Sequence, residues 1–333
     1  MGSEKSAPAL AQRHVVAFAS GRDGDRRVAG VAAAARVVHG LAQAGAGETW
    51  LTIGDGRPLA RATLADIERL RGTALVRVVA PGEAPADIPA MPAPAMNAMA
   101  ILRGTAKPSD GIVSRYFNRP ISQRISWVAL AIPGARPIHA TIVCALFALI
   151  LFFGMLVGGK DGLMLGGILF QAASVIDGVD GEMARATFRA TDFGKSLDSA
   201  IDMATNFLFV LAFTLHLGRH GPPYIHWLGF WSIGLMVTGA VLIGWRTRAG
   251  GAPLSFDLLK RSGPVRNPVD LIYWAVQTLT GRDVFAFLFM VLIIVGLAHV
   301  ALMIFASVGT IWIIYVFATL FLPGKSAAFR GAA

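Results

Sequence analysis

The sequence reads DGVDGEMAR at residues 177–185 and GKSLDSAID at residues 194–202, and each stretch borders a strongly apolar segment. Asp177 and Asp180 are spaced i, i+3, and Asp198 and Asp202 are spaced i, i+4, so each pair faces one way from a helix. Two such helices packed side by side would place four carboxylates around one small volume. Because an ionisable side chain beside lipid is costly unless it is paired or ligated, these acids need a positive partner. Their oxygens suit Mg²⁺ or Mn²⁺, as one ion or two.

The same residues resemble the signature of a known family. The pattern D-x-x-D-G-x-x-A-R, then eight residues, then G-x-x-x-D-x-x-x-D, is typical of the CDP-alcohol phosphotransferases, and every fixed position is filled here. The matching residues are Asp177, Asp180, Gly181, Ala184, Arg185, Gly194, Asp198 and Asp202. A membrane hairpin with acids placed by chance is disfavoured, because unpaired carboxylates are rare within membranes.

This resemblance implies a function. A substituted phosphate group would pass from a CDP-linked alcohol, such as CDP-diacylglycerol, to the hydroxyl of an acceptor alcohol, releasing CMP. It implies that Asp177, Asp180, Asp198 and Asp202 bind Mg²⁺ or Mn²⁺, as two ions, and that Asp202 is also the general base. The residues implied to hold the CDP moiety are Gly181, Ala184, Arg185 and Gly194. A homodimer is implied as well.

Composition places the chain in the membrane class. Of 333 residues, 55% are hydrophobic, and 30 Lys and Arg against 20 acids give a net charge of +10. The basic residues lie beside apolar runs, which is typical of membrane flanks, so membrane lipids and no nucleic acid are expected as partners. The single cysteine, Cys144, excludes a disulfide framework and a cysteine metal site within this sequence.

The apolar runs predict an all-α membrane domain of six transmembrane helices over residues 137–333. The first four spans are expected at residues 140–159, 162–183, 199–218 and 222–245. Residues 284–322 would supply two more, turning near Gly296 or His299. The predicted outer turns hold only Lys160 and Arg219, whereas the other flanks are rich in Lys and Arg. The positive-inside rule therefore predicts a cytoplasmic N-terminus and active site, in a bacterial or archaeal inner membrane.

Residues 1–98 predict a cytoplasmic α/β domain that ends in a linker. Strands at 14–20, 49–53 and 74–80 alternate with helices at 29–44 and 63–71, the second capped by Thr63, so a parallel sheet is expected. This order is similar to the front of a nucleotidyltransferase domain, which some relatives of the family carry fused at the N-terminus. The loop at residues 20–25 lacks the repeated glycines and lysine that cradle a triphosphate, which favours a structural or regulatory role. Residues 81–98, rich in Pro and Ala, indicate an extended linker.

Residues 99–136 predict a juxtamembrane helix in the headgroup plane, because apolar residues alternate with Arg115, Arg119 and Arg124. It resembles the helix that precedes the first span in family members using inositol phosphate acceptors, and a generic interfacial anchor is the open alternative. The following residues 137–141 stand where the family has Pro-Asn-x-x-Thr, with Ile138 in place of Asn.

Two questions stay open in the sequence. The first is the acceptor. Basic residues between the fourth and fifth spans could bind a phosphorylated acceptor or only extend toward headgroups, and Arg282, beside Asp283, is the candidate for the acceptor site. The others are Arg246, Arg248, Lys260 and Arg261. The second is the class of protein, because a divalent-cation transporter or channel could use the same acids. A transporter is expected to show inverted repeats and acids near the bilayer midplane.

Overall fold

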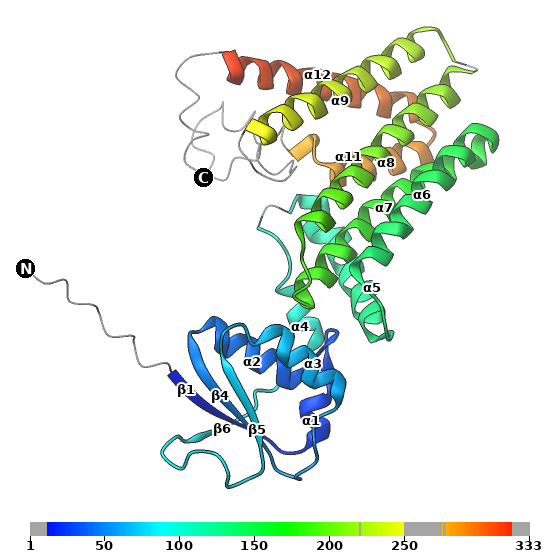
Figure 1. The fold of residues 1–333 in the computed structure, drawn as a ribbon. Coiled ribbons are helices and arrows are strands. Elements are labelled where there is room, and N and C mark those ends of the chain that lie inside the picture. The colour runs from blue at the N-terminus through cyan, green and yellow to red at the C-terminus, as the bar shows by residue number, and fades with distance from the viewer. Residues whose placement is uncertain (1–11, 109, 220, 250–274, 276–277, 322–333) are drawn as a thin grey trace, which may run out of the picture. The chain divides into compact units, whose positions relative to one another are not determined.

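The computed structural model describes residues 12–108, 110–219, 221–249, 275 and 278–321. The chain divides into two compact units (Figure 1). Unit 1 comprises Met1–Thr105, Trp127–Pro133 and Arg185–Arg189. Unit 2 comprises Ala106–Ser126, Gly134–Ala184 and Ala190–Ala333.

Within its described residues, unit 1 contains a parallel sheet with the strand order β5-β4-β1-β6. The strands are β1 (Gln12–Phe18), β4 (Ala46–Ile53), β5 (Leu75–Val79) and β6 (Ala90–Pro92). The other elements are α1 (Gly21–Asp25), the pair β2 (Arg27–Val28) and β3 (Val31–Ala32), α2 (Ala33–Gln43), α3 (Arg61–Leu70) and α4 (Ala98–Arg103). Val16 and Phe18 of β1 and Leu51 and Ile53 of β4 alternate into one buried core. The predicted α/β domain with a parallel sheet is confirmed.

Two local predictions for this domain need correction. Part of the expected linker is strand β6, which pairs with β1 in the register Ala17↔Pro92, and the Ala93 amide donates to Ala17 O at 2.9 Å. An edge strand tolerates proline because one side of it needs no ladder hydrogen bond. Thr63 is not the cap of α3, because the helix already begins at Arg61 and Ala60 is its N-cap, without a side-chain hydrogen bond.

The juxtamembrane segment is helical and belongs mainly to unit 2. A short π-helix, η1 (Ser114–Asn118), runs directly into α5 (Arg119–Ala131). The Ser114 amide, at the start of η1, donates a 2.7 Å hydrogen bond to Asp283 Oδ2. Asp283 therefore caps this segment from a distant part of the sequence.

Six further helices follow among the described residues of the chain. They are α6 (Pro137–Val157), α7 (Gly159–Ala186), α8 (Asp192–Gly218), α9 (Tyr224–Ala249), α11 (Arg282–Ile294) and α12 (Ala298–Phe321). Among the described residues, four stretches are long and apolar enough to cross a membrane. These are Pro137–Val157, Gly159–Ala186, Asp192–Gly218 and Tyr224–Leu242. The first four predicted spans therefore appear as helices, and the chain turns at Gly296 with φ of 79°, as expected. Helices α11 and α12 are not among these four stretches of the described residues, so a fifth and a sixth span stay a prediction.

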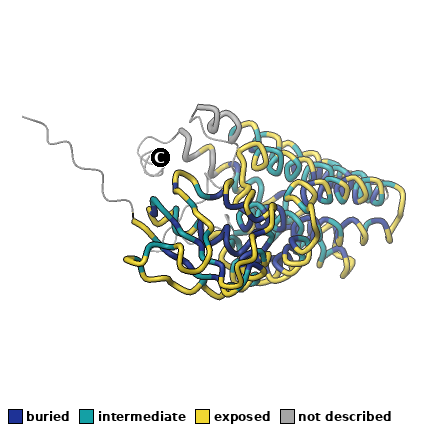
Figure 2. Tube along the Cα trace, turned by 60° about the horizontal axis from the view of Figure 1, so that its bottom comes forward, coloured by how far each residue is buried: buried dark blue, intermediate teal, exposed yellow. Residues whose placement is uncertain are grey.

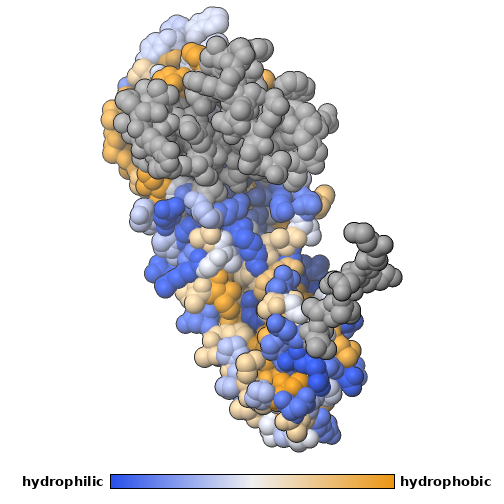
Figure 3. Space-filling view, turned by 90° about the vertical axis from the view of Figure 1, so that its left-hand side faces the viewer, coloured by the Kyte–Doolittle hydropathy of each residue, from blue (hydrophilic) through white to orange (hydrophobic). Residues whose placement is uncertain are grey.

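The outer sides of these helices present apolar side chains. Phe153 and Val157 of α6 and Trp227 and Val241 of α9 are exposed, and Figure 2 shows exposed positions along the helices. Hydrophobic surface is visible at the edge of the helical region in Figure 3. Such a surface is stable in lipid rather than in water, which agrees with a membrane protein.

Candidate functional site

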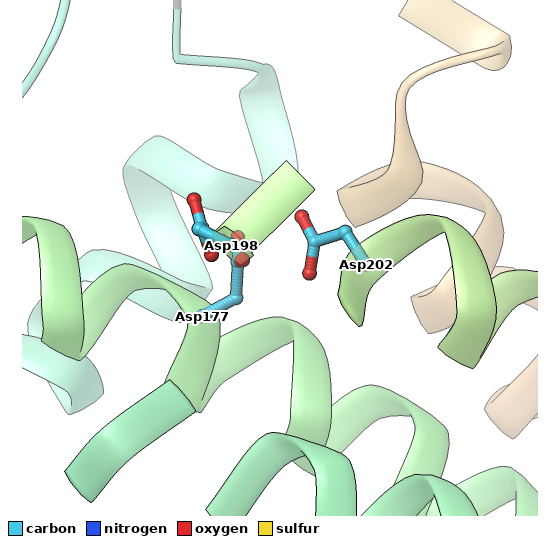
Figure 4. A group of neighbouring side chains, drawn as sticks. All are labelled: Asp177, Asp198 and Asp202. Atoms are coloured by element: carbon cyan, nitrogen blue, oxygen red, sulfur yellow. The ribbon is translucent and has the colours of Figure 1, made fainter. Parts of the chain in front are cut away.

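Three of the motif acids converge between α7 and α8. One carboxylate oxygen from each of Asp177, Asp198 and Asp202 lies within 4.8 Å of the other two. Asp177 comes from α7 and the other two from α8, and Figure 4 shows their side chains grouped together. The sequence spacing therefore placed these three acids correctly.

Aromatic packing two turns away explains why these acids meet. The rings of Phe170 on α7 and Phe209 on α8 stack at a centroid distance of 3.8 Å, and both are fully buried. Asp177 lies two turns after Phe170, and Asp202 lies two turns before Phe209, so each acid shares a face with its phenylalanine. Phe289 of α11 closes the same core, edge-on to Phe209 at 5.0 Å. The apolar stack thus fixes the pairing of the two helices that brings Asp177 opposite Asp202.

Asp180, the fourth predicted ligand, is held from another helix. Its side chain is buried, and its Oδ2 accepts a 2.7 Å hydrogen bond from Thr141 Oγ1 on α6. Asp180 is still close enough to Asp177 and Asp198 to interact with both. The predicted convergence of four carboxylates therefore becomes three that face one another and a fourth beside them, tied to α6.

Arg282, predicted as an acceptor residue, lies against the acids. Its Nη1 donates to Asp202 Oδ1 and lies 3.3 Å from Asp177 Oδ1, and its side chain is largely buried. Its Nε and Nη2 are buried and have no hydrogen-bond partner among the described residues. The side chains of Arg246 and Arg248 are not described, and Lys260 and Arg261 lie outside the described residues.

The four residues expected at the CDP moiety lie in the last turns of α7 and the first turn of α8. Gly181 and Ala184 are half-buried on α7, and Gly194 is exposed in the first turn of α8, where its amide donates to Thr191 Oγ1 at 3.1 Å. Arg185 belongs to unit 1, and its Nε donates to Thr105 O at 2.9 Å.

Glu182 is a further acid of α7 that the sequence motif does not single out. This residue is completely buried on α7, and its carboxylate accepts hydrogen bonds from Arg119, Ser122 and Ser126. The family pattern leaves this position open, so the motif drew no attention to it. An acid in an apolar helix was itself the available signal, since such a residue needs a partner.

The cluster suits a divalent metal ion. Carboxylate oxygens are hard ligands of the kind that divalent cations take, and one oxygen from each of the three acids lies within 4.8 Å of the others. The three acids outnumber the one guanidinium beside them, so the site has a surplus of negative charge for a cation to neutralise.

Comparisons with known proteins agree with the motif. Residues 138–320, more than half of the chain, match the family model described as CDP-alcohol phosphatidyltransferase. A protein of Aquifex aeolicus is 39% identical over 110 residues, which are 32% of this chain and 24% of that relative. A protein of Thermococcus kodakarensis is 41% identical over 106 residues, or 31% of this chain and 23% of the relative. A protein of Rubrobacter xylanophilus is 32% identical over 171 residues, or 50% of this chain and 37% of the relative.

All three relatives carry the name "Bifunctional IPC transferase and DIPP synthase". The matches to the first two span only 24% and 23% of those proteins. By its match over residues 138–320, the chain belongs to the CDP-alcohol phosphatidyltransferase family.

Proposed function

We propose that this protein is a metal-dependent CDP-alcohol phosphotransferase of the membrane. It transfers a substituted phosphate group from a CDP-linked alcohol to the hydroxyl of an acceptor alcohol and releases CMP, producing a phospholipid or a related polar phosphodiester. The observation that carries the proposal is the meeting of Asp177, Asp198 and Asp202 within 4.8 Å, in a chain that matches the family model over the same helices.

The acids have distinct roles in this proposal. Asp177, Asp198 and Asp202, with Asp180 beside them, hold two Mg²⁺ or Mn²⁺ ions. A metal ion held there would neutralise the diphosphate and stabilise the negative charge on the oxygens of the phosphate group that is transferred. Asp202 accepts the proton of the attacking hydroxyl as general base. Its place one turn beyond Asp198 keeps it beside the metal-binding carboxylates.

The donor is bound through its CDP moiety. Arg185 binds a phosphate oxygen through its guanidinium, which can donate two parallel hydrogen bonds. Gly181 and Ala184 leave room beside the acids because their side chains are absent or small. Gly194 does the same at the start of α8.

Arg282 recognises the acceptor. Nη1 faces Asp202, and the two unpartnered donors, Nε and Nη2, lie together on another edge of the guanidinium. That edge can make a bidentate contact with a phosphate group. A hydroxyl on the same acceptor would then lie near Asp202, the general base. A phosphorylated acceptor such as inositol phosphate fits this arrangement better than an uncharged alcohol.

The membrane arrangement follows the distribution of basic residues. We place the N-terminal domain and the acids on the cytoplasmic side, count α11 and α12 as the fifth and sixth spans, and assign a homodimer by family membership. A divalent-cation transporter is disfavoured because the acids lie on helices within residues 138–320, the part of the chain that matches the CDP-alcohol phosphatidyltransferase family model.

A product assay tests the function. The purified full-length protein would be incubated with Mg²⁺, a donor (CDP-diacylglycerol or CDP-inositol) and an acceptor (inositol, inositol phosphate, glycerol phosphate or none). CMP release and the phosphodiester product would be measured by chromatography and mass spectrometry. We expect CMP to appear with one donor only and to require a phosphorylated acceptor. Absence of CMP release with every pair would overturn the proposal, as would equal release with no acceptor.

A further inference from the structure

Helix α7 has a second polar face besides the one that carries the metal-site acids. Glu182 is completely buried on this face, one residue after Gly181 of the motif. A buried carboxylate is strongly unfavourable unless hydrogen bonds and an opposite charge replace water. Its partners therefore have to be supplied by a neighbouring element, and that element is α5.

Three residues on one face of the juxtamembrane helix hold Glu182. Ser122 Oγ donates to Glu182 Oε1 and Ser126 Oγ to Glu182 Oε2, each at 2.6 Å. Arg119 Nη1 donates to Oε1 at 2.9 Å. Because Arg119, Ser122 and Ser126 are spaced i, i+3 and i+7, they lie on the same side of α5.

Arg119 connects two carboxylates. Its Nε and Nη2 donate to the two oxygens of Asp110 at 2.8 and 2.9 Å, while Nη1 faces Glu182. Burial alone would lower the pKa of Arg119, but the two carboxylates raise it above its ordinary value. Burial alone would likewise raise the pKa of Asp110, but Arg119 holds it below its ordinary value. The planar guanidinium binds Asp110 through two parallel N–H bonds while a third N–H faces Glu182, and a compact ammonium group does not reproduce this geometry.

The contact continues along both helices. A Cβ added at Gly178 would lie 3.1 Å from Ser122 Oγ and 3.2 Å from Arg119 Nη1, so this glycine permits the close approach. Deeper along α7, Gln171 Nε2 donates to Asn118 Oδ1 at 2.8 Å, and Asn118 Nδ2 donates to Ser174 Oγ at 3.2 Å. We call this row the α5–α7 seam. Its members are Asn118, Arg119, Ser122 and Ser126 with Gln171, Ser174, Gly178 and Glu182.

The α5–α7 seam and the metal-site acids lie on different faces of α7. With about 100° between successive helical residues, Gln171, Ser174, Gly178 and Glu182 share one face. Asp177 then points about 100° away from Gly178, and Asp180 about 160° away. The rotation of α7 that satisfies Glu182 at the seam is therefore the rotation that turns both aspartates toward α6 and α8.

We propose that Arg119 is a positioning residue for the metal site. This inference rests on the proposed phosphotransferase function. Through Glu182, it fixes the rotation of α7 that brings Asp177 opposite Asp198 and Asp202. The competing view is that Arg119 only anchors the juxtamembrane helix and contributes to stability without affecting metal binding.

Metal affinity, measured without substrate, separates these two views. Mn²⁺ binding to the purified full-length protein would be followed by electron paramagnetic resonance, with thermal unfolding and CMP release recorded on the same samples. The variants are Arg119→Gln, Arg119→Lys and the double variant Arg119→Gln/Glu182→Gln, which removes the buried charge in case the single variant does not fold. The matched control is Arg124→Gln, an exposed arginine on the same helix.

We expect folded Arg119→Gln, or the double variant, to bind Mn²⁺ about tenfold or more weakly, the usual scale for residues that orient metal ligands. Arg119→Lys should lie between these variants and the wild type, and Arg124→Gln should match the wild type. Wild-type Mn²⁺ affinity in folded Arg119→Gln or in the double variant would overturn the inference, while CMP release by the wild type would leave the proposed function intact. A wild-type protein that neither binds Mn²⁺ nor releases CMP would overturn the proposed function itself.

Discussion

Thr141 Oγ1 on α6 donates a 2.7 Å hydrogen bond to Asp180 Oδ2 on α7, and both side chains are buried. Thr141 lies one turn after Pro137, the first residue of α6. The position of Asp180 therefore depends on α6, whereas Asp177, Asp198 and Asp202 lie where α7 and α8 meet. A residue outside the acidic motif thus determines where one of its carboxylates points.

Replacing Thr141 tests this dependence. Thr141→Val keeps the shape of the side chain but removes the donor, which leaves a buried carboxylate less well satisfied and should cost about 1 to 3 kcal/mol of unfolding free energy. The Mg²⁺ concentration for half-maximal CMP release should rise, because Asp180 is free to turn away. Thr141→Ser, which retains the hydroxyl, is the control and should behave nearly as the wild type. Wild-type stability and Mg²⁺ dependence in Thr141→Val would show that the hydrogen bond has no role.

The acceptor role of Arg282 predicts a selective kinetic defect. Arg282→Lys loses the bidentate edge of the guanidinium and should raise the KM for the phosphorylated acceptor, with the KM for the CDP donor nearly unchanged. Arg282→Ala should lose about 1.5 to 3 kcal/mol of binding, the usual value of a hydrogen bond to a charged group. Steady-state kinetics with each substrate varied in turn measures both constants.

The control for Arg282 is Arg124→Lys, an exposed arginine on α5. If Arg282 serves only as the charge partner of Asp202 and Asp177, Arg282→Lys should leave the KM for the acceptor unchanged. Unaltered kinetics in Arg282→Lys would therefore remove this residue from the acceptor site.

Hydrogen bonds within unit 1 indicate how removal of the N-terminal domain would affect the rest of the chain. Arg36, buried on α2, donates to Val28 O, Ala29 O and Ala186 O at 2.7, 2.9 and 2.6 Å. Arg69 donates to Thr187 O at 3.2 Å. A chain beginning at Lys107 would lack Arg36 and Arg69, which donate to Ala186 O and Thr187 O. Its unfolding temperature should therefore fall.

Metal-dependent CMP release should nevertheless persist in that truncated chain, because the three acids and the α5–α7 seam belong to unit 2. No CTP-dependent nucleotidyl transfer is expected from residues 1–106. Complete loss of CMP release from a folded truncated chain would instead assign the N-terminal domain an essential part in the reaction, and CTP-dependent transfer would assign it an activity of its own.

The sequence was sufficient for features that depend on local spacing. Asp177, Asp198 and Asp202 were placed together because helical periodicity sets the direction of each side chain, and the apolar runs set the helices. The alternation of strands and helices gave the parallel sheet for the same reason.

Features that depend on which helices pack against one another could not be predicted from local sequence spacing. The bonds from Thr141 to Asp180 and from Arg119 to Glu182 join residues far apart in the sequence, and nothing local selects these partners. Strand β6 was missed because its three residues gain their strand geometry from pairing with β1, while their own composition favours a linker. Arg282 was assigned to a basic cluster by its position in the chain, whereas tertiary packing brings it to the acids.

The most direct test of the account is Mn²⁺ binding and CMP release measured on Asp198→Asn beside the matched control Asp192→Asn. Asp192 lies on the same helix, but its side chain is 80% exposed and pairs with Lys195. We predict that Asp198→Asn folds, loses Mn²⁺ binding and loses CMP release, while Asp192→Asn retains both and excess EDTA abolishes the remaining activity. Full CMP release by Asp198→Asn, or undiminished wild-type activity in EDTA, would contradict the assignment of these acids as the metal site of a phosphotransferase.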